Sequence, residues 1–255
     1  MRFGRPGADG TMPVRYTDSM LKAVVFDFDG VIVDSEPLHF RAFARVAESI
    51  GVTFDYDHYV QHMIGYDDRD VCRLLLARAT GTGGDAGPDK CSVDEDHVCA
   101  LKDRKGKLFE QIVGDGVAAI PGAARLIETA SSQMPIAISS GATRADIDLM
   151  LDALGLTGRF DPIVSADDVA RSKPDPESYR QAVAGVAAGN PHLRLEPGDC
   201  LAIEDTAAGI ESARGAGLWT LGLTTSGPAE RLTRAHRIAE SLEGLTVERL
   251  QQWLS

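Results

Sequence analysis

The sequence predicts an α/β protein, in which a Rossmann-like, doubly wound parallel sheet carries an inserted all-helical unit. Three observations lead to this fold class. A short apolar strand, Ala23 to Phe26, follows the first twenty or so residues. Residues 36–116 show only the apolar spacing of helices. From Ile120 onward, apolar strands alternate with amphipathic helices, which is typical of a parallel sheet with helices on both faces.

These patterns divide the chain into three parts. Residues 1–20 are rich in Gly and Pro and have little apolar periodicity, so we expect a flexible N-terminal extension. We expect an α/β core domain over residues 21–35 and 117–255, and a helical cap domain over residues 36–116. Open α/β sheets bind ligands at the carboxyl ends of their strands, so an insertion directly after the first strand is well placed to act as a lid.

Apolar spacing and capping residues predict the individual elements. In the cap domain, helices are expected near residues 38–50, 56–64, 67–80 and 98–113, with a Gly-rich loop over residues 81–89. In the core domain, strands are expected at residues 135–140, 160–165, 200–203 and 218–223. Helices are expected there at residues 122–131, 143–154, 177–187, 207–216 and 247–254, and an irregular connection at residues 184–198.

Charge and cysteine content restrict the class of partner. A net charge of −12 argues against non-specific binding to nucleic acid or to an anionic membrane. The four cysteines form no C-x-x-C pair, and we expect reduced thiols in a cytoplasmic protein. No apolar run is long enough to span a bilayer, so we expect no membrane association. The expected assembly is a monomer or a weak homodimer.

Two acids stand directly after the first strand. Asp27 and Asp29 are spaced one apart and are followed by Gly30. Carboxylates at the end of a buried strand are costly unless a partner compensates their charge. A hard divalent cation prefers carboxylate oxygens, so the pair predicts a Mg²⁺ site.

Three later stretches complete a set of groups suited to phosphoryl transfer, which depends on positioning and on charge neutralisation. A strand ends in Ser139, Ser140 and Gly141, whose hydroxyl and backbone N–H groups can bind phosphate oxygens. Lys173 precedes a Pro-x-Pro loop that holds it in place. Another strand ends in Glu204 and Asp205, which can anchor a metal ion.

The order of these motifs resembles that of the haloacid dehalogenase-like phosphohydrolases with a helical cap. The first motif reads Asp-x-Asp-Gly-x-Ile-x-Asp-Ser from Asp27 to Ser35. The resemblance implies that Asp27 is the nucleophile that becomes an aspartyl phosphate, and that Asp29 is the general acid and base. It also implies that Ser140, with Ser139 as the alternative, binds phosphate together with Gly141. The resemblance further implies that Lys173 screens the negative charge of Asp27 and of the phosphoryl group.

The same resemblance implies a Mg²⁺ cofactor and several substrate contacts. The metal ligands would be Asp27, the backbone carbonyl of Asp29, and Asp205, with Glu204 either as a ligand or beside the ligands. Cap residues expected to contact the substrate are Glu36, His39, Tyr66, Arg69 and Lys105. Lys105 and His39 are similar to cap residues of β-phosphoglucomutases. Those enzymes carry an Arg where this chain has Asp68, which weakens the likeness to a mutase.

The expected function is Mg²⁺-dependent hydrolysis of a small phosphorylated metabolite, such as a sugar phosphate or phosphoglycolate. One alternative is a β-phosphoglucomutase-like phosphotransferase, in which a second sugar hydroxyl replaces water as the acceptor. Another is a regulatory binding protein built on a retired phosphatase core. The four intact motifs argue against the second alternative, because a binding module has no need to keep all of them.

Overall fold

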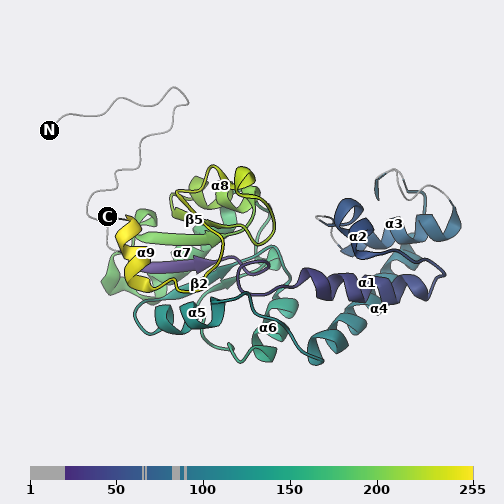
Figure 1. The fold of residues 1–255 in the computed structure, drawn as a ribbon, viewed down its shortest axis with the longest axis horizontal. Coiled ribbons are helices and arrows are strands. Elements are labelled where there is room, and N and C mark those ends of the chain that lie inside the picture. The colour runs from purple at the N-terminus through teal and green to yellow at the C-terminus, as the bar shows by residue number, and fades with distance from the viewer. Residues whose placement is uncertain (1–20, 65, 67, 82–86, 89–90, 255) are drawn as a thin grey trace, which may run out of the picture. The chain divides into compact units, whose positions relative to one another are not determined.

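The structure is a computed structural model that describes residues 21–64, 66, 68–81, 87–88 and 91–254. Its contacts divide the chain into two compact units. The core unit contains residues 21–34 and 118–254, and the helical unit contains residues 35–117 (Figure 1). The N-terminal extension predicted over residues 1–20 and most of the predicted loop at 81–89 lie outside the described residues.

The core unit is built on a parallel sheet of six strands in the order β3-β2-β1-β4-β5-β6 (Figure 1). The strands are β1 (Ala23–Phe26), β2 (Ile136–Ser139), β3 (Ile163–Val164), β4 (Cys200–Glu204), β5 (Trp219–Leu223) and β6 (Arg237–Ala239). β1 therefore lies in the middle, between β2 and β4. This arrangement confirms the predicted doubly wound parallel sheet.

Two predictions about this sheet were wrong. β6 was not predicted, because it is a three-residue edge strand in which Arg237 and Ile238 are exposed, so it leaves no apolar run in the sequence. β3 is only two residues long, although a strand was predicted over residues 160–165. Phe160 still packs edge-on against Phe26, so the apolar signal there reflects burial and not strand pairing.

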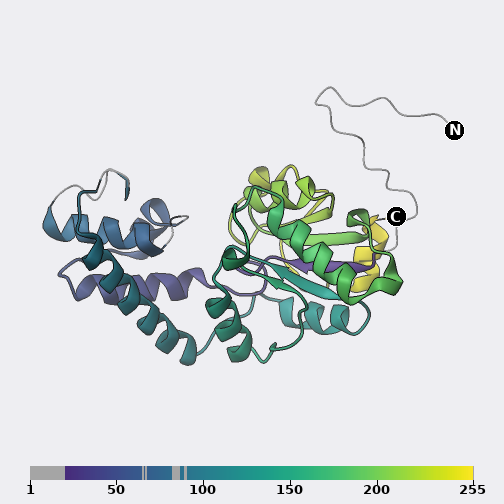
Figure 2. The ribbon, with the colours of Figure 1, turned by 180° about the vertical axis from the view of Figure 1, so that it is seen from behind.

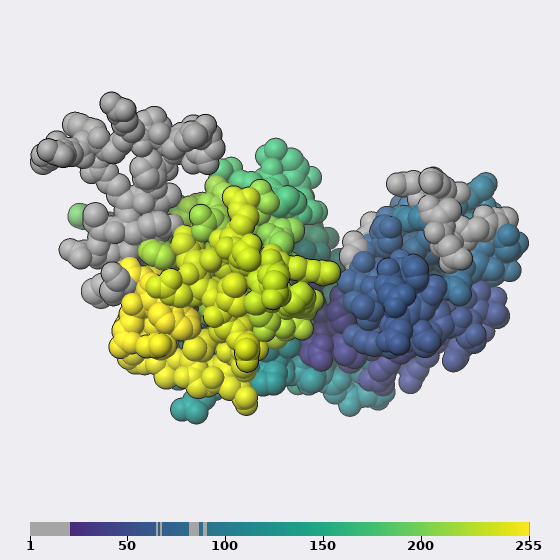
Figure 3. Space-filling model, turned by 45° about the horizontal axis from the view of Figure 1, so that its top comes forward, coloured from purple at the N-terminus to yellow at the C-terminus, as the bar shows by residue number. Residues whose placement is uncertain are grey.

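Five helices belong to the core unit: α5 (Ala123–Ser131), α6 (Arg144–Ala153), α7 (Glu177–Gly189), α8 (Ala207–Gly215) and α9 (Val247–Leu254). Thr143 caps α6 as predicted, since its side chain accepts a hydrogen bond from the backbone N–H of Asp146. The connection predicted at residues 184–198 is more ordered than expected, because α7 extends to Gly189 and two short 3₁₀ turns follow, Pro191–Leu193 and Pro197–Asp199. In the space-filling view, α9 lies on the surface of the core unit (yellow, Figure 3).

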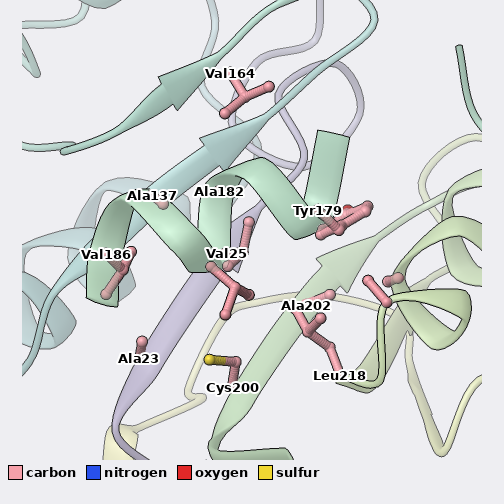
Figure 4. Packing of buried hydrophobic residues seen from close by; sticks show 13 residues of the cluster. Ala23, Val25, Ala137, Val164, Tyr179, Ala182, Val186, Cys200, Ala202 and Leu218 are labelled. Atoms are coloured by element: carbon pink, nitrogen blue, oxygen red, sulfur yellow. The ribbon is translucent and has the colours of Figure 1, made fainter. Parts of the chain in front are cut away.

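One face of the sheet packs against α7 and α8 through small apolar side chains (Figures 2 and 4). Ala23 and Val25 of β1 face these helices, as do Cys200 and Ala202 of β4. Side chains alternate between the two faces of a strand, so the next residues in the same series, Asp27 and Glu204, continue along the face that α7 covers. The apolar packing of β1 and β4 against α7 thus determines on which face of the sheet Asp27 and Glu204 lie.

The helical unit contains α1 (Glu36–Glu48), α2 (Tyr56–His62), α3 (Asp68–Thr80) and α4 (Glu95–Gly114), and no strand occurs among its described residues. Asp55 caps α2 and Asp94 caps α4, each through a bond from a backbone N–H of the first turn. α2 ends two residues earlier than predicted. The interior is a cluster of apolar side chains from all four helices, including Phe43, Tyr59, Leu75 and Val98.

The described helices are too short or too polar to cross a bilayer. The longest of them, α4, spans twenty residues but carries charged side chains along its length.

Candidate active site

Residues from four separate stretches of the core unit meet at the carboxyl ends of β1, β2 and β4. The ammonium of Lys173 links them. Its Nζ lies 2.9 Å from Asp27 Oδ1 and 2.6 Å from Glu204 Oε1, and it donates to the backbone carbonyl of Ser139 at 2.9 Å. The structure therefore brings Asp27, Lys173 and Glu204 into one cluster.

Two neighbouring carboxylates keep the Lys173 ammonium protonated despite its burial. Burial disfavours the cation, but the carboxylates of Asp27 and Glu204 outweigh this effect and raise the pKa of Lys173. The ammonium also lies 5.1 Å from the centroid of the Tyr179 ring. A fixed positive charge beside Asp27 lowers the repulsion that an anionic substrate would meet there.

Glu204 is completely buried, and both of its oxygens accept hydrogen bonds. Oε1 accepts from Lys173 and from the Tyr179 hydroxyl at 2.9 Å. Oε2 accepts from the Thr206 hydroxyl at 3.0 Å and from the Thr206 backbone N–H at 3.3 Å. With four protein donors, this carboxylate is fixed in position and orients the lysine.

The first turn of α8 is shaped around this carboxylate. Thr206 caps the helix, and Gly209 leaves the space that the Glu204 side chain occupies. A Cβ at Gly209 would lie 1.9 Å from the Glu204 carboxyl carbon, so Glu204 would have to move.

Gly209→Ala is therefore expected to lower stability and catalytic activity together, although Ala is the better helix former by about 1 kcal/mol. The matched control is Gly106→Ala in α4, where an added Cβ meets nothing within 4 Å and Ala should stabilise the protein. Urea unfolding and steady-state kinetics of both variants measure the difference. A Gly209→Ala protein that is as stable and active as Gly106→Ala would contradict this description of Glu204.

Asp205 follows Glu204 at the strand end, and the two oxygens of its carboxylate have different surroundings. Its Oδ2 accepts a short hydrogen bond from the Ser226 hydroxyl, whereas Oδ1 is buried and has no hydrogen-bond partner among the described residues. Gly30 lies against the same carboxylate with φ +70°, and a Cβ there would lie 2.0 Å from Oδ2. The turn after Asp29 thus requires glycine both for its backbone and for the space around Asp205.

The acids outnumber the cations in this cluster. Asp27, Glu204 and Asp205 can each offer a carboxylate oxygen so that the three lie within 4.8 Å of one another. Burial and then the Glu204 charge raise the pKa of Asp27 well above its usual value, and the same two causes raise that of Asp205 to about 7. An excess of buried negative charge and an unpartnered oxygen fit a hard divalent cation such as Mg²⁺.

The remaining residues predicted for the core site occupy the same edge of the sheet. Asp29 is half-buried in the turn that the hydrogen bond from Gly30 N–H to the Val33 carbonyl closes, and its charge contributes to the raised pKa of Asp27. Ser140 directly follows β2. Its Oγ accepts from the Ala142 N–H at 2.9 Å, which leaves the hydroxyl proton for donation.

Ser139 and Gly141, the neighbours of Ser140, differ from it. Ser139 contributes its backbone carbonyl to Lys173, and its own hydroxyl oxygen is buried without a partner among the described residues. Gly141 is exposed, with open space where a side chain would be. Of the two serines, Ser140 is thus the one whose hydroxyl already has a fixed orientation at the strand end.

Sequence reasoning missed three residues that hold the predicted ones in place: Tyr179, Thr206 and Ser226. Thr206 had a signal, because a Thr before the small residues of a helix is a typical N-cap. Tyr179 had none, since a buried aromatic on α7 is indistinguishable from a core residue in the sequence. Ser226 follows β5, and strand ends are where site residues gather in this fold.

The predicted cap residues all lie in the helical unit, and four of them bond to side chains of that unit. Glu36 accepts from the Tyr59 hydroxyl at 2.8 Å, and Arg69 Nη2 donates to Glu95 at 2.7 Å. Tyr66 is exposed. Lys105 is only 1% exposed, and its contact with substrate stays a prediction.

Comparisons with known proteins show the family of the chain. Residues 21–217 match the profile of the haloacid dehalogenase-like hydrolases. The chain belongs to this family. It is 30% identical over 224 residues to validoxylamine A 7′-phosphate phosphatase from Streptomyces hygroscopicus subsp. limoneus, a match that covers 88% of this chain and 95% of that enzyme. It is 28% identical over 236 residues to β-phosphoglucomutase from Bacillus subtilis, covering 91% and 96% of the two chains.

A solved structure shows the same fold. A CbbY variant from Rhodobacter sphaeroides in complex with xylulose-(1,5)bisphosphate superposes with a TM-score of 0.69 at 25% identity, covering 91% of this chain and 99% of that one. Family membership and the phosphatase among these relatives identify the chain as a haloacid dehalogenase-like phosphatase.

Proposed function

We propose that this phosphatase hydrolyses a small phosphorylated sugar with the help of Mg²⁺ and through an aspartyl phosphate formed on Asp27. The observation that carries the proposal is the ion pair of 2.9 Å between Asp27 and Lys173 at the strand ends, with Asp205 beside it. The validoxylamine phosphatase and the CbbY complex support a phosphorylated sugar as the class of substrate.

In the first half-reaction, an oxygen of Asp27 attacks phosphorus and the bond to the sugar oxygen breaks. Lys173 and the Ser140 hydroxyl hold the phosphoryl oxygens. Asp29 donates its proton to the departing alcohol. Asp27, Asp205 and the backbone carbonyl of Asp29 would hold the Mg²⁺ ion, with Glu204 beside them. When bound, the ion supplies charge neutralisation between the carboxylate and the phosphate.

In the second half-reaction, Asp29 takes a proton from water, and the resulting hydroxide attacks the phosphorus of the aspartyl phosphate. The acyl phosphate bond then breaks, releasing inorganic phosphate and restoring the Asp27 carboxylate. The two acids therefore need different protonation states at the start of the cycle, with Asp27 ionised and Asp29 protonated. Burial and the Glu204 charge raise the pKa of Asp27, and the Lys173 ammonium opposes them. A divalent cation held beside Asp27 would act in the same direction as the lysine and favour the ionised form.

Hydrolysis of p-nitrophenyl phosphate tests the proposal first. We expect turnover with Mg²⁺, its loss when EDTA is added, and recovery when excess Mg²⁺ is restored. A panel of sugar phosphates and phosphoglycolate, assayed by phosphate release, then identifies the substrate. Phosphate release that is unchanged in EDTA would overturn the metal assignment, and no release from any ester would overturn the hydrolase assignment.

A β-phosphoglucomutase is among the relatives, so phosphoryl transfer to a second sugar hydroxyl is the second candidate function. A mutase would interconvert glucose phosphates in the presence of β-glucose 1,6-bisphosphate faster than it releases inorganic phosphate. Our proposal expects inorganic phosphate to be released faster than glucose phosphates are interconverted.

A further inference from the structure

The loop that follows β5 brings two hydroxyl groups to the acids of the core unit. Thr225 donates its hydroxyl to the backbone carbonyl of Gly30 at 2.5 Å. Ser226 donates to Asp205 Oδ2 through a short hydrogen bond. Gly30 makes this approach possible, because a Cβ there would lie 2.0 Å from Asp205 Oδ2 and 2.7 Å from Ser226 Oγ. Thr225 and Ser226 are themselves exposed, so we expect substitutions there to leave the apolar core intact.

The bond from Ser226 gives the two oxygens of Asp205 different roles. Oδ2 is engaged by the hydroxyl, whereas Oδ1 is buried and has no hydrogen-bond partner among the described residues. Asp205 can therefore offer Oδ1 to a cation without breaking a bond to the protein. It could offer both oxygens only if the Ser226 hydroxyl moved away.

Protein donors also restrict the other two acids of the cluster. Asp27 Oδ1 accepts the backbone N–H of Phe28 at 2.7 Å and lies 2.9 Å from Lys173 Nζ. Both oxygens of Glu204 accept hydrogen bonds from protein donors. At least one oxygen of each carboxylate is thus already engaged, and the cluster is poorly suited to two-oxygen ligation by any of them.

The number of available oxygens distinguishes Mg²⁺ from Ca²⁺. Mg²⁺ requires nearly octahedral ligands, keeps several of its waters, and is usually held by one or two carboxylates. Ca²⁺ takes about six to eight oxygens and often binds both oxygens of one carboxylate. A site in which a protein hydroxyl reserves one oxygen of an aspartate therefore suits Mg²⁺ better than Ca²⁺.

On the basis of the Mg²⁺ requirement in the proposed function, we propose that Ser226 determines the metal specificity of this enzyme. By engaging Oδ2 it confines Asp205 to ligation through one oxygen, which favours Mg²⁺ over Ca²⁺. Ser226 is a positioning residue, because it contacts Asp205 and none of the reacting groups. Thr225 has a different role, since its bond fixes the turn after Asp29 whichever ion is bound.

The test measures metal binding without substrate. Full-length protein is freed of metal with EDTA, dialysed, and titrated with Mg²⁺ or with Ca²⁺ in a calorimeter. We expect the wild type to bind Mg²⁺ more tightly than Ca²⁺. Ser226→Ala should weaken Mg²⁺ binding, because Asp205 loses its orientation, and should give Ca²⁺ access to both oxygens. The ratio of the Ca²⁺ Kd to the Mg²⁺ Kd should fall about tenfold, the usual size of a hydrogen bond to a charged group.

Two further variants separate the Ser226 bond from the anchoring of the loop. Thr225→Val keeps the side-chain shape but removes the bond to the Gly30 carbonyl, so it should weaken the binding of both ions by similar factors and leave the ratio unchanged. Ser226→Thr keeps a hydroxyl at the same position and should retain the wild-type ratio.

A Ser226→Ala protein with the wild-type ratio would overturn the proposal. A shift of equal size in Thr225→Val would do the same, because the specificity would then belong to the loop as a whole. These outcomes are separable from a failure of the proposed function. If the wild type binds neither ion, the metal assignment and this proposal fail together. If it binds Mg²⁺ and the ratio is unaffected by Ser226→Ala, the metal assignment stands and only the role of Ser226 is wrong.

Discussion

Asp27→Asn is expected to lower kcat for phosphate ester hydrolysis by at least about a thousandfold, with little change in the fold. Loss of a nucleophile removes the covalent route, and comparable substitutions in other enzymes cost about this much or more. The amide is nearly isosteric, and its oxygen can still accept the backbone N–H of Phe28, which now bonds to Asp27 Oδ1 at 2.7 Å. The measurement is steady-state hydrolysis of p-nitrophenyl phosphate at saturating Mg²⁺.

The control for this substitution is Asp152→Asn, at an exposed position of α6 in the same unit. The kcat of this control should lie within about twofold of the wild-type value, as is usual for substitutions at the surface. Mass spectrometry after rapid acid quenching should find a phosphorylated enzyme in the wild type and none in Asp27→Asn. Undiminished turnover in Asp27→Asn would refute the nucleophile assignment.

Lys173→Met is expected to affect stability and catalysis together. The substitution leaves the buried carboxylates of Asp27 and Glu204 without their cation, and breaking a buried ion pair in this way costs about 3–5 kcal/mol. We expect kcat to fall at least about a hundredfold, because the lysine also offsets charge in the transition state. Urea unfolding in EDTA and steady-state kinetics measure the two effects.

The stability of this variant should also depend on pH in a defined direction. Burial and Glu204 already raise the pKa of Asp27 in the folded protein, and removal of the ammonium raises it further. The folded state then holds a proton that the unfolded chain releases. Stability is therefore greatest below the ordinary Asp pKa of 3.8 and declines as pH rises through the raised pKa of the folded protein. Lys102→Met, at an exposed position, should show neither effect. A Lys173→Met protein with wild-type stability at pH 8 would contradict the ion-pair account.

The sequence was sufficient to predict the strand ends, because apolar runs followed by acids, serines or lysine are local patterns. β1, β2 and β4 each end at the residues expected to carry the chemistry. The helical unit was predictable for the same reason, since the apolar spacing of its helices is undisturbed. The edge strand β6 was not, because its residues are exposed and its position depends on pairing with β5.

Pairwise contacts between distant residues could not be predicted from the sequence. Nothing near Lys105 indicates that its ammonium is balanced by Asp68 from another helix, so it was expected to reach the substrate. Likewise, Glu204 and Asp205 look equivalent in the sequence. Strand alternation separates them, sending Glu204 toward Lys173 and Tyr179 and leaving Asp205 with an oxygen that has no protein partner among the described residues.

The central place of β1 has a consequence for how the chain acquires activity during its synthesis. β1 emerges early, yet its neighbours β2 and β4 follow only after the whole helical unit has been made. Asp27 can contact Lys173 and Asp205 only after the chain has been synthesised as far as Asp205. Long loops must then close to bring these residues together, and such closure is slow. We therefore expect no hydrolytic activity from a nascent or truncated chain that ends before Asp205, because β4 has not yet paired with β1.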